Sequence, residues 1–165
     1  MKKILSAVLA AMLILTLTAT AFAATGVGSA TSVKVTPATA EAAGSVSVDT
    51  YMCAVTLDEN GVITAVQFDC VQSKGAFDAT GAVSGEAAIQ PQTKRELGDA
   101  YGMKVASPIG KEFYEQMDAL AAWCVGKTVE EVLALNAEDA DLKAGCTVYI
   151  GTELIALQKA AANAQ

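Results

Sequence analysis

The sequence predicts an α+β domain in which a small antiparallel sheet, built on a β-hairpin, packs against two or three helices. Two β-rich runs, 46–57 and 62–71, flank the segment Asp-Glu-Asn-Gly, and Asn-Gly is the strongest short signal for a hairpin turn. An apolar stripe with helical spacing follows at 109–124. Strands come before helices along the chain, and this order is typical of α+β domains.

The first 23 residues have the three parts of a secretory signal peptide. Lys2 and Lys3 form a basic start, residues 4–17 form an apolar core, and 21–23 (Ala-Phe-Ala) is a small-x-small cleavage site. The apolar core is shorter than the roughly 20 residues that a membrane span needs, so it favours a signal peptide over an anchor. We therefore expect cleavage before Ala24, a secreted or cell-envelope location and no membrane span after cleavage.

The mature chain divides into a short leading segment and one domain. Residues 24–44 are rich in Ala, Gly, Ser and Thr, and we expect a flexible N-terminal segment there, with 31–35 compatible with a short strand. Residues 45–165 have the length of a single α+β domain with its own core.

The hairpin pattern places two of the four cysteines on the core side of the sheet. Alternation directs Cys53 and Cys70 to that side. The turn sets Cys53 opposite Phe68, so Cys70 is a diagonal neighbour about 7–8 Å away, which is poor for a disulfide. Export permits two disulfides among Cys53, Cys70, Cys124 and Cys146, and packing as four buried thiols is equally compatible with the pattern.

Helical signals dominate the second half. Residues 72–108 show little periodicity and are expected to be a surface connection with a short helix, or else a functional loop. Ser107 and Pro108 are typical of a helix start, and Gly126 of a helix end. The stripe between them consists of Ile109, Phe113, Met117, Leu120 and Cys124.

The remaining elements are short. Thr128 and Glu131 have the spacing of a capping box, which predicts a helix to about Leu135. An acidic loop is expected at 136–143, a strand at 146–150 and a last helix from residue 151.

Composition excludes several kinds of chemistry. The chain has no histidine, so Ser-His and Cys-His nucleophile systems are excluded. Its formal net charge of −7 opposes binding to nucleic acid and to anionic membranes. Adjacent carboxylates such as Glu130 and Glu131 are typical of a solvated face, and no cluster has the spacing of a metal site. We therefore expect no metal and no enzyme activity of the domain on its own.

One C-terminal stretch carries a resemblance. Residues 141–147 read Asp-Leu-Lys-Ala-Gly-Cys-Thr, and a helix with alanines in its later turns follows. This stretch resembles the C-terminal signature Asp-x-x-Ser-Gly-Ala-Thr of the FMN-binding domain family. Asp141, Gly145 and Thr147 match the signature, while Ala144 and Cys146 replace its Ser and Ala. The turn at 58–66 is also similar to a hairpin of that family.

The resemblance implies a covalent flavoprotein. In the family, the threonine equivalent to Thr147 takes FMN through a phosphoester bond, and a transferase attaches it outside the cytoplasm. The mature chain also resembles a group of small exported proteins of unknown function from anaerobic Gram-positive bacteria. Independently, a glycine at 145 allows a phosphate to approach the backbone, and a following helix N-terminus offers free N–H groups. Packing of 147–150 as a further strand is the alternative interpretation.

Two functions follow as expectations. The first is a flavin carrier that holds FMN at Thr147, with Asp141 and Gly145 in the attachment turn, and serves extracytoplasmic electron transfer with an FMN transferase and a redox partner. The second is a secreted or cell-envelope binding domain that has lost the flavin and binds a small ligand or a protein. A cleft lined by Tyr101, Lys94 and Arg95 is then the expected place for an acidic ligand.

Overall fold

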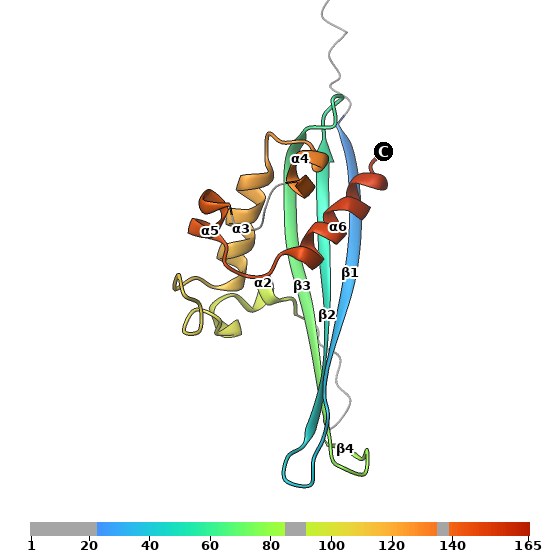
Figure 1. Cartoon of the computed structure of the whole chain (residues 1–165). Helices are drawn as coiled ribbons and strands as arrows, with labels where there is room; N and C mark the ends of the chain where they lie inside the picture. The colour runs from blue at the N-terminus through green and yellow to red at the C-terminus, as the bar shows by residue number, and fades with distance from the viewer. Residues whose placement is uncertain (1–22, 85–91, 135–138) are drawn as a thin grey trace, which may run out of the picture.

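A long, twisted antiparallel sheet is the central element of the fold (Figure 1). The computed structural model describes residues 23–84, 92–134 and 139–165. The strands are β1 (Ala24–Thr36), β2 (Gly44–Leu57), β3 (Ile63–Phe77) and β4 (Val83–Ser84), in the order β1-β2-β3-β4. The α+β class and the sheet built on a hairpin are confirmed.

The predicted hairpin is confirmed in its register. Cys53 lies opposite Phe68, and Cys70 lies opposite Tyr51, so Cys70 is the diagonal neighbour of Cys53. The Asp58 carboxylate accepts hydrogen bonds from the backbone N–H groups of Asn60 and Val62. Gly61 has a φ of +75°, which a residue without a β-carbon adopts readily. The strands run further than predicted, however, because β3 continues to Phe77.

The prediction of a flexible segment at 24–44 is wrong for its first part. Residues Ala24–Thr36 form β1, which pairs with β2 along its whole length. Ala24 lies opposite Leu57 at one end of the pairing, and Thr36 lies opposite Ser45 at the other. The first part of the strand was not predicted because its many small residues show no strong apolar alternation. Two of them, Gly26 and Gly28, must be glycine for α6 to pack on β1. A β-carbon at Gly26 would lie 2.0 Å from the Ala160 carbonyl oxygen, and one at Gly28 would lie 2.4 Å from the Ala156 carbonyl oxygen.

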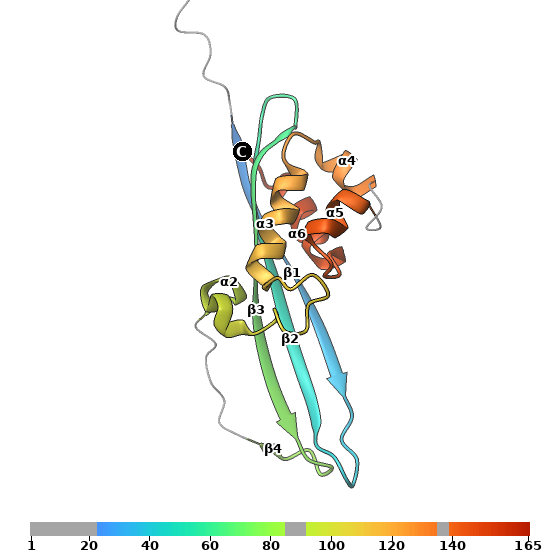
Figure 2. The same cartoon turned by 90° about the vertical axis from the view of Figure 1, so that its left-hand side faces the viewer.

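The described helices are α2 (Lys94–Leu97), the 3-10 helix η1 (Gly98–Tyr101), α3 (Phe113–Cys124), α4 (Val129–Ala134), α5 (Ala140–Gly145) and α6 (Gly151–Ala162). Helices α3, α4, α5 and α6 lie on one face of the sheet, whereas α2 lies beside its β3 edge, as Figures 1 and 2 show. Helix α3 packs on β3, and α6 packs on β1 and β2. We call this side, onto which Cys53, Phe68 and Cys70 project, the covered face.

The predicted helices agree with the structure except at their boundaries. The capping box is confirmed, since the Thr128 hydroxyl accepts from the Glu131 amide and the Glu131 carboxylate accepts from the Thr128 amide. The helix start at Ser107-Pro108 is wrong: Gly110, with a φ of +63°, turns the chain, and Glu112 is the N-cap of α3.

Two predictions near the C-terminus are also wrong. The described part of the expected acidic loop is helix α5, which begins because the Asp139 carboxylate accepts from the amides of Asp141 and Leu142; residues 136–138 lie outside the described part. The segment 146–150 is an extended connection and not a strand, because its amides are bound by a side chain of α3. Helix α6 begins at Gly151 as predicted.

The core lies between the covered face and the helices. It includes Val55, Ile63, Phe68, Met117, Leu120 and Leu157, all almost fully buried. The four cysteines also lie there as free thiols. Burial raises the pKa of Cys53, Cys70 and Cys124 to about 12 and that of Cys146 to about 11, which makes them unreactive. In the described ranges, no helix has the length and apolarity needed to cross a membrane.

The opposite side of the sheet carries no described helix and is called the open face. It includes Val27 and Val33 of β1, Met52 and Ala54 of β2, and Asp69 of β3. The strands also extend beyond the helices (Figure 2). We call this extension, made of residues 31–36, 44–50 and 71–77, the distal arm.

The close approach of α6 to β1 predicts the effect of a single methyl group. We expect Gly28→Ala to lower the free energy of unfolding by about 3 kcal/mol, because the new β-carbon meets rigid helix backbone. Gly75→Ala is the matched control, since its β-carbon meets a side-chain methyl of Val46 at 3.3 Å; its cost should be under about 1 kcal/mol. Urea unfolding measures both. Equal losses would contradict the packing of α6 described here.

Candidate functional site

The three residues of the FMN signature lie close in sequence but have different roles in the structure. Asp141 is exposed in the first turn of α5. Gly145 is the last residue of α5, and a β-carbon there would lie 2.6 Å from the Cβ of Ala119 on α3. Helix packing therefore accounts for this glycine. Thr147 is exposed on the connection between α5 and α6.

A single buried side chain fixes the backbone around Thr147. The Gln116 carbonyl Oε1 accepts from the Thr147 amide at 2.9 Å, the Val148 amide at 3.3 Å and the Thr147 hydroxyl at 3.3 Å. Its Nε2 donates to the Ser107 hydroxyl and to the Lys111 carbonyl oxygen. Gln116 is fully buried, so it links the connection 146–150 to the loop before α3.

A second buried polar side chain holds that loop. The Glu112 carboxylate accepts from the backbone amides of Met103 and Lys104 at 3.0 and 2.9 Å. The Glu112 amide in turn donates to the Glu115 carboxylate at 2.8 Å. Glu112 is almost fully buried, and the bonds to backbone amides satisfy its carboxylate without a basic side chain.

The expectation that Lys94 faces a ligand cleft is wrong, because this lysine is 6% exposed. Its ammonium lies 3.1 Å from the Asp49 carboxylate. It also lies 5.0–5.5 Å from three ring centres, those of Tyr51, Tyr101 and Phe113, within the range of cation–π attraction. Lys94 is thus an internal cation enclosed by aromatic rings.

The charges around Lys94 are balanced. Burial alone lowers the pKa of Lys94, but Cys70, Tyr101 and Tyr51 raise it, with a net result above its ordinary value. Burial alone raises the pKa of Asp49, but the hydrogen bond from Gln72 and the charge of Lys94 together lower it by more, so the pKa lies below its ordinary value and Asp49 stays ionised. The two residues therefore form an ion pair at neutral pH.

Arg95, the neighbour of Lys94, is also engaged within the chain. Its guanidinium donates to the Asp118 carboxylate at 2.8 Å and to the Phe68 carbonyl oxygen at 3.2 Å. Its backbone amide donates to Asp69. The predicted basic pair therefore joins α2 to β3 and α3, and it does not line an anion site.

Two described residues have a buried polar atom without a hydrogen-bond partner, namely Arg95 at Nε and Glu153 at Oε2. Glu153 lies in the first turn of α6 and is 1% exposed. Burial raises the pKa of Glu153 to about 7, although its own backbone amide and Lys94 act in the opposite direction. A substantial share of the molecules therefore carries a neutral Glu153 at neutral pH.

Lys94, Glu112, Gln116 and Glu153 all gather where α2, α3 and α6 begin. Tyr149 marks this junction on the surface: its ring is 84% exposed, and its hydroxyl lies over Gly151 at the start of α6. Thr147 and Tyr149 are thus two exposed residues of the connection between α5 and α6. No group of three or more Cys, Asp or Glu residues suited to a metal ion is found in the described ranges.

Sequence reasoning missed three of these residues, although two had a detectable signal. Gln116 lies three residues after Phe113 and four before Leu120, so a polar residue interrupts the apolar stripe. Glu153 lies three residues before Ala156 and seven before Ala160, a spacing that places it on the same helix face as these two buried alanines. Glu112 had no signal, because its partners are backbone amides of a loop.

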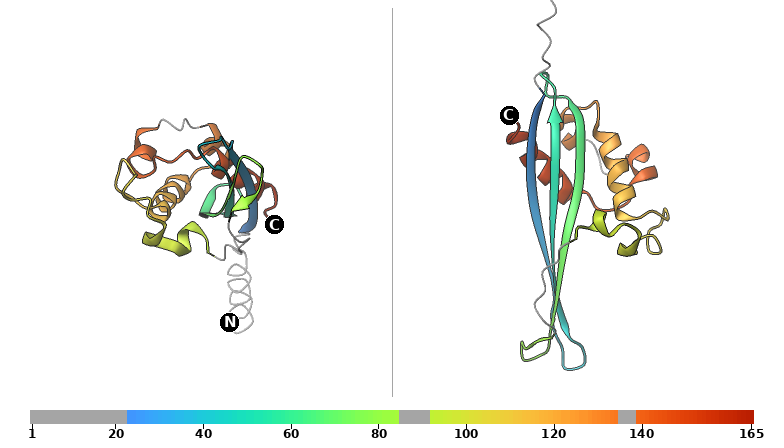
Figure 3. Two further views of the ribbon diagram at one scale, coloured as in Figure 1. Left: turned by 90° about the horizontal axis from the view of Figure 1, so that it is seen from below. Right: turned by 180° about the vertical axis from the view of Figure 1, so that it is seen from behind.

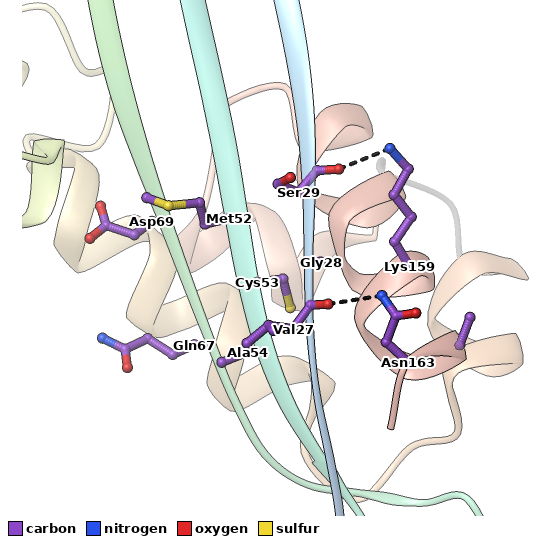
Figure 4. Close-up of a pocket in the computed structure, with 11 residues that line it drawn as sticks. Val27, Gly28, Ser29, Met52, Cys53, Ala54, Gln67, Asp69, Lys159 and Asn163 are labelled. Carbon is purple, nitrogen blue, oxygen red and sulfur yellow. Dashed lines mark hydrogen bonds between the residues drawn. The ribbon is translucent and has the colours of Figure 1, made fainter. Parts of the chain in front are cut away.

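A pocket lies elsewhere, on the open face and the β1 edge. It has a volume of about 740 Å³ and is lined on the open face by Val27, Met52, Ala54, Gln67 and Asp69, and at the β1 edge by Lys159 and Asn163 of α6 (Figure 4). Lys159 donates to the Ser29 carbonyl oxygen and Asn163 to the Val27 carbonyl oxygen, as the dashed lines show. Thr147 and Gln116 lie on the other side of the sheet, so pocket size and signature residues indicate different places. We give more weight to Thr147, because this pocket is open and its polar rim is occupied by internal bonds.

Burial of Glu153 predicts a pH dependence of stability. Its folded pKa is raised, so the native state binds more protons than the unfolded state between pH 4.5 and 7, and stability falls as pH rises through this window. Glu153→Gln removes this contribution. We expect the stability of this variant relative to the parent to increase by about 2 kcal/mol between pH 5 and pH 8.

Urea unfolding of both proteins at the two pH values provides the measurement. The control is Glu130→Gln, which changes an exposed first-turn glutamate of α4 and should give no such pH-dependent difference. A constant difference between Glu153→Gln and the parent would show that Glu153 is ionised in the folded protein, against the burial described above.

Comparison with known proteins gives one partial similarity. The chain is 37% identical over 90 residues to a chlorophenol reductase of Desulfitobacterium hafniense. The match covers 48% of this chain and 28% of the reductase, so the chain spans well under half the length of that relative. No family model matches the sequence, and no solved structure matches the fold.

Proposed function

We propose that the mature chain is an exported flavin-carrying domain in which the Thr147 hydroxyl forms a phosphoester with FMN; a transferase would supply FMN from a flavin dinucleotide, whose phosphoanhydride bond breaks and releases the nucleoside monophosphate, while the hydroxyl loses its proton. The observation that carries the proposal is an exposed threonine on a fixed backbone, in the sequence context that resembles the FMN-binding signature. A phosphoester acceptor needs a hydroxyl that a transferase can reach. Thr147 is exposed, and Gln116 holds its amide and hydroxyl from the protein side.

The surroundings of Thr147 suit a phosphorylated aromatic group in two respects. Helix α6 begins four residues later, and the first amides of a helix attract anions. The exposed Tyr149 ring offers an apolar surface beside the attachment point. Gly145 and Asp141 contribute differently from the expectation: Gly145 allows α5 to pack on α3, and Asp141 is free at the surface.

The protein residues have positioning roles in this proposal. FMN, when bound, supplies the capacity to accept and release one or two electrons. Gln116 fixes the backbone that carries the acceptor hydroxyl, in the connection between α5 and α6. An FMN transferase and an extracytoplasmic redox partner are the partners that this function requires, and the signal-peptide pattern at 1–23 directs the chain to the same side of the membrane.

The partial relative supports a redox setting. It is named as a reductase, and a region shared with such a protein is compatible with a role in electron transfer. Because the chain spans only a small part of that relative, the reaction on chlorophenols itself is not proposed for this chain.

A binding domain without flavin is the second candidate. The open pocket beside β1 favours it, since Val27, Met52 and Ala54 form an apolar floor there. The pocket does not involve Thr147, so binding at this place would persist when Thr147 is changed.

Intact mass of the mature protein, co-expressed with an FMN transferase, tests the flavin proposal. We expect an added mass of one FMN less one water, absent in Thr147→Ala and retained in Thr147→Ser, which keeps a hydroxyl. Thr64→Ala, at an exposed threonine of β3, is the matched control and should retain the adduct. An unmodified parent protein, in cells where a known acceptor domain is flavinylated, would refute covalent attachment.

A further inference from the structure

Strand β1 forms one edge of the sheet, and the described residues cover only half of that edge. Near its start, Thr25 exchanges two backbone hydrogen bonds with Gln165. Next along the strand, Asn163 binds the Val27 carbonyl oxygen and Lys159 binds the Ser29 carbonyl oxygen. The end of α6 thus satisfies the outward polar groups as far as Ser29.

The edge beyond Ser29 lacks such cover. Because outward groups alternate along a strand, Thr31, Val33 and Val35 direct their N–H and C=O groups away from β2. In the parts of the chain that the structure describes, none of these groups has a backbone partner. This part of β1 belongs to the distal arm, whose β1 edge no described helix covers (Figure 3).

The sequence protects this free edge only weakly, with Lys34 within it and Pro37 directly after it. Natural edge strands usually carry proline, a bulge or several charges that prevent pairing. Residues 31–36 contain no proline and a single charged residue, Lys34, and the pairing of β1 with β2 shows no irregularity. Val33 and Val35 are also 62% and 59% exposed on the open face.

We propose that two copies of this chain associate through residues 31–35 of β1, paired antiparallel about a two-fold axis at Val33. In this register Val33 faces Val33 of the second copy, and Thr31 faces Val35. All three outward residues then form hydrogen-bonded pairs, which gives six backbone hydrogen bonds in the antiparallel geometry. The two sheets join into one.

The side chains favour this register. On the open face, the two Val33 side chains meet at the axis and the valines of each copy adjoin, including Val46 and Val48 opposite β1 in each sheet. On the other face, Lys34 lies opposite Ser32, so the lysines of the two copies are not directly opposed. Self-complementarity about one residue is what a two-fold interface requires, and it favours a second copy over an unrelated peptide.

The interface is small, so association should be weak and dependent on concentration. Short edge pairing lies at the low end of specific interfaces, and we expect a dissociation constant on the order of 10–100 μM. Both copies carry the same negative net charge. Added salt should therefore strengthen the dimer by screening this repulsion.

Analytical ultracentrifugation of the mature chain tests the proposal. Val33→Lys places two like charges opposite each other and should weaken the dimer by at least tenfold. Val27→Lys is the matched control, because Val27 lies on the same strand and face with a similar exposure of 68% but in the covered half of the edge. It should dimerise as the parent does.

Oxidative cross-linking gives a second readout. Val33→Cys should form a disulfide-linked dimer faster than Val27→Cys, since only residue 33 meets its own copy. A parent chain that is monomeric at about 1 mM would overturn the proposal. So would a dimer that Val33→Lys leaves unchanged, or one that Val27→Lys disrupts instead.

Discussion

The hydrogen bonds of the Gln116 side chain are the interaction on which the candidate site depends. A buried carboxamide has two donors and an acceptor that must find partners, or the burial becomes costly. Gln116 meets this requirement with the backbone of the connection 146–150 on one side and with the loop before α3 on the other. The constraint is mutual, because the carboxamide needs these segments and they have no regular secondary structure to fix them.

The other buried polar residues extend this junction. Glu112 holds the loop through two backbone amides, and Lys94 joins α2 to β2 through Asp49. Each satisfied group adds specificity, because an alternative packing would leave it unpaired. Glu153 is the exception: its unpaired oxygen and raised pKa make it the group at which the junction is least stable. Buried polar side chains therefore lie beneath the surface that carries Thr147 and Tyr149, whereas apolar side chains pack against the sheet.

The elements predicted from the sequence are those encoded by local patterns. The Asn-Gly hairpin, the Thr128–Glu131 capping box and the start of α6 depend on residues a few positions apart. The short strand predicted at 31–35 is part of β1, but the first part of β1 was missed because Gly26 and Gly28 are explained by α6, more than a hundred residues away. Gly145 illustrates the same limit: the signature suggested a phosphate beside it, and Ala119 lies there instead. Lys94 looked like a surface charge because its counter-ion and ring partners come from separate elements.

Amide hydrogen exchange measured by NMR tests the role of Gln116 most directly. Gln116→Met keeps the length and volume of the side chain and removes its hydrogen bonds. The amides of Thr147 and Val148 should be protected in the parent protein and should exchange at least about tenfold faster in the variant. A tenfold change corresponds to a loss of about 1.4 kcal/mol in the free energy of local opening. Amides in the centre of β2 should keep their protection. Unchanged protection at Thr147 and Val148 would contradict the claim that this carboxamide fixes the candidate site.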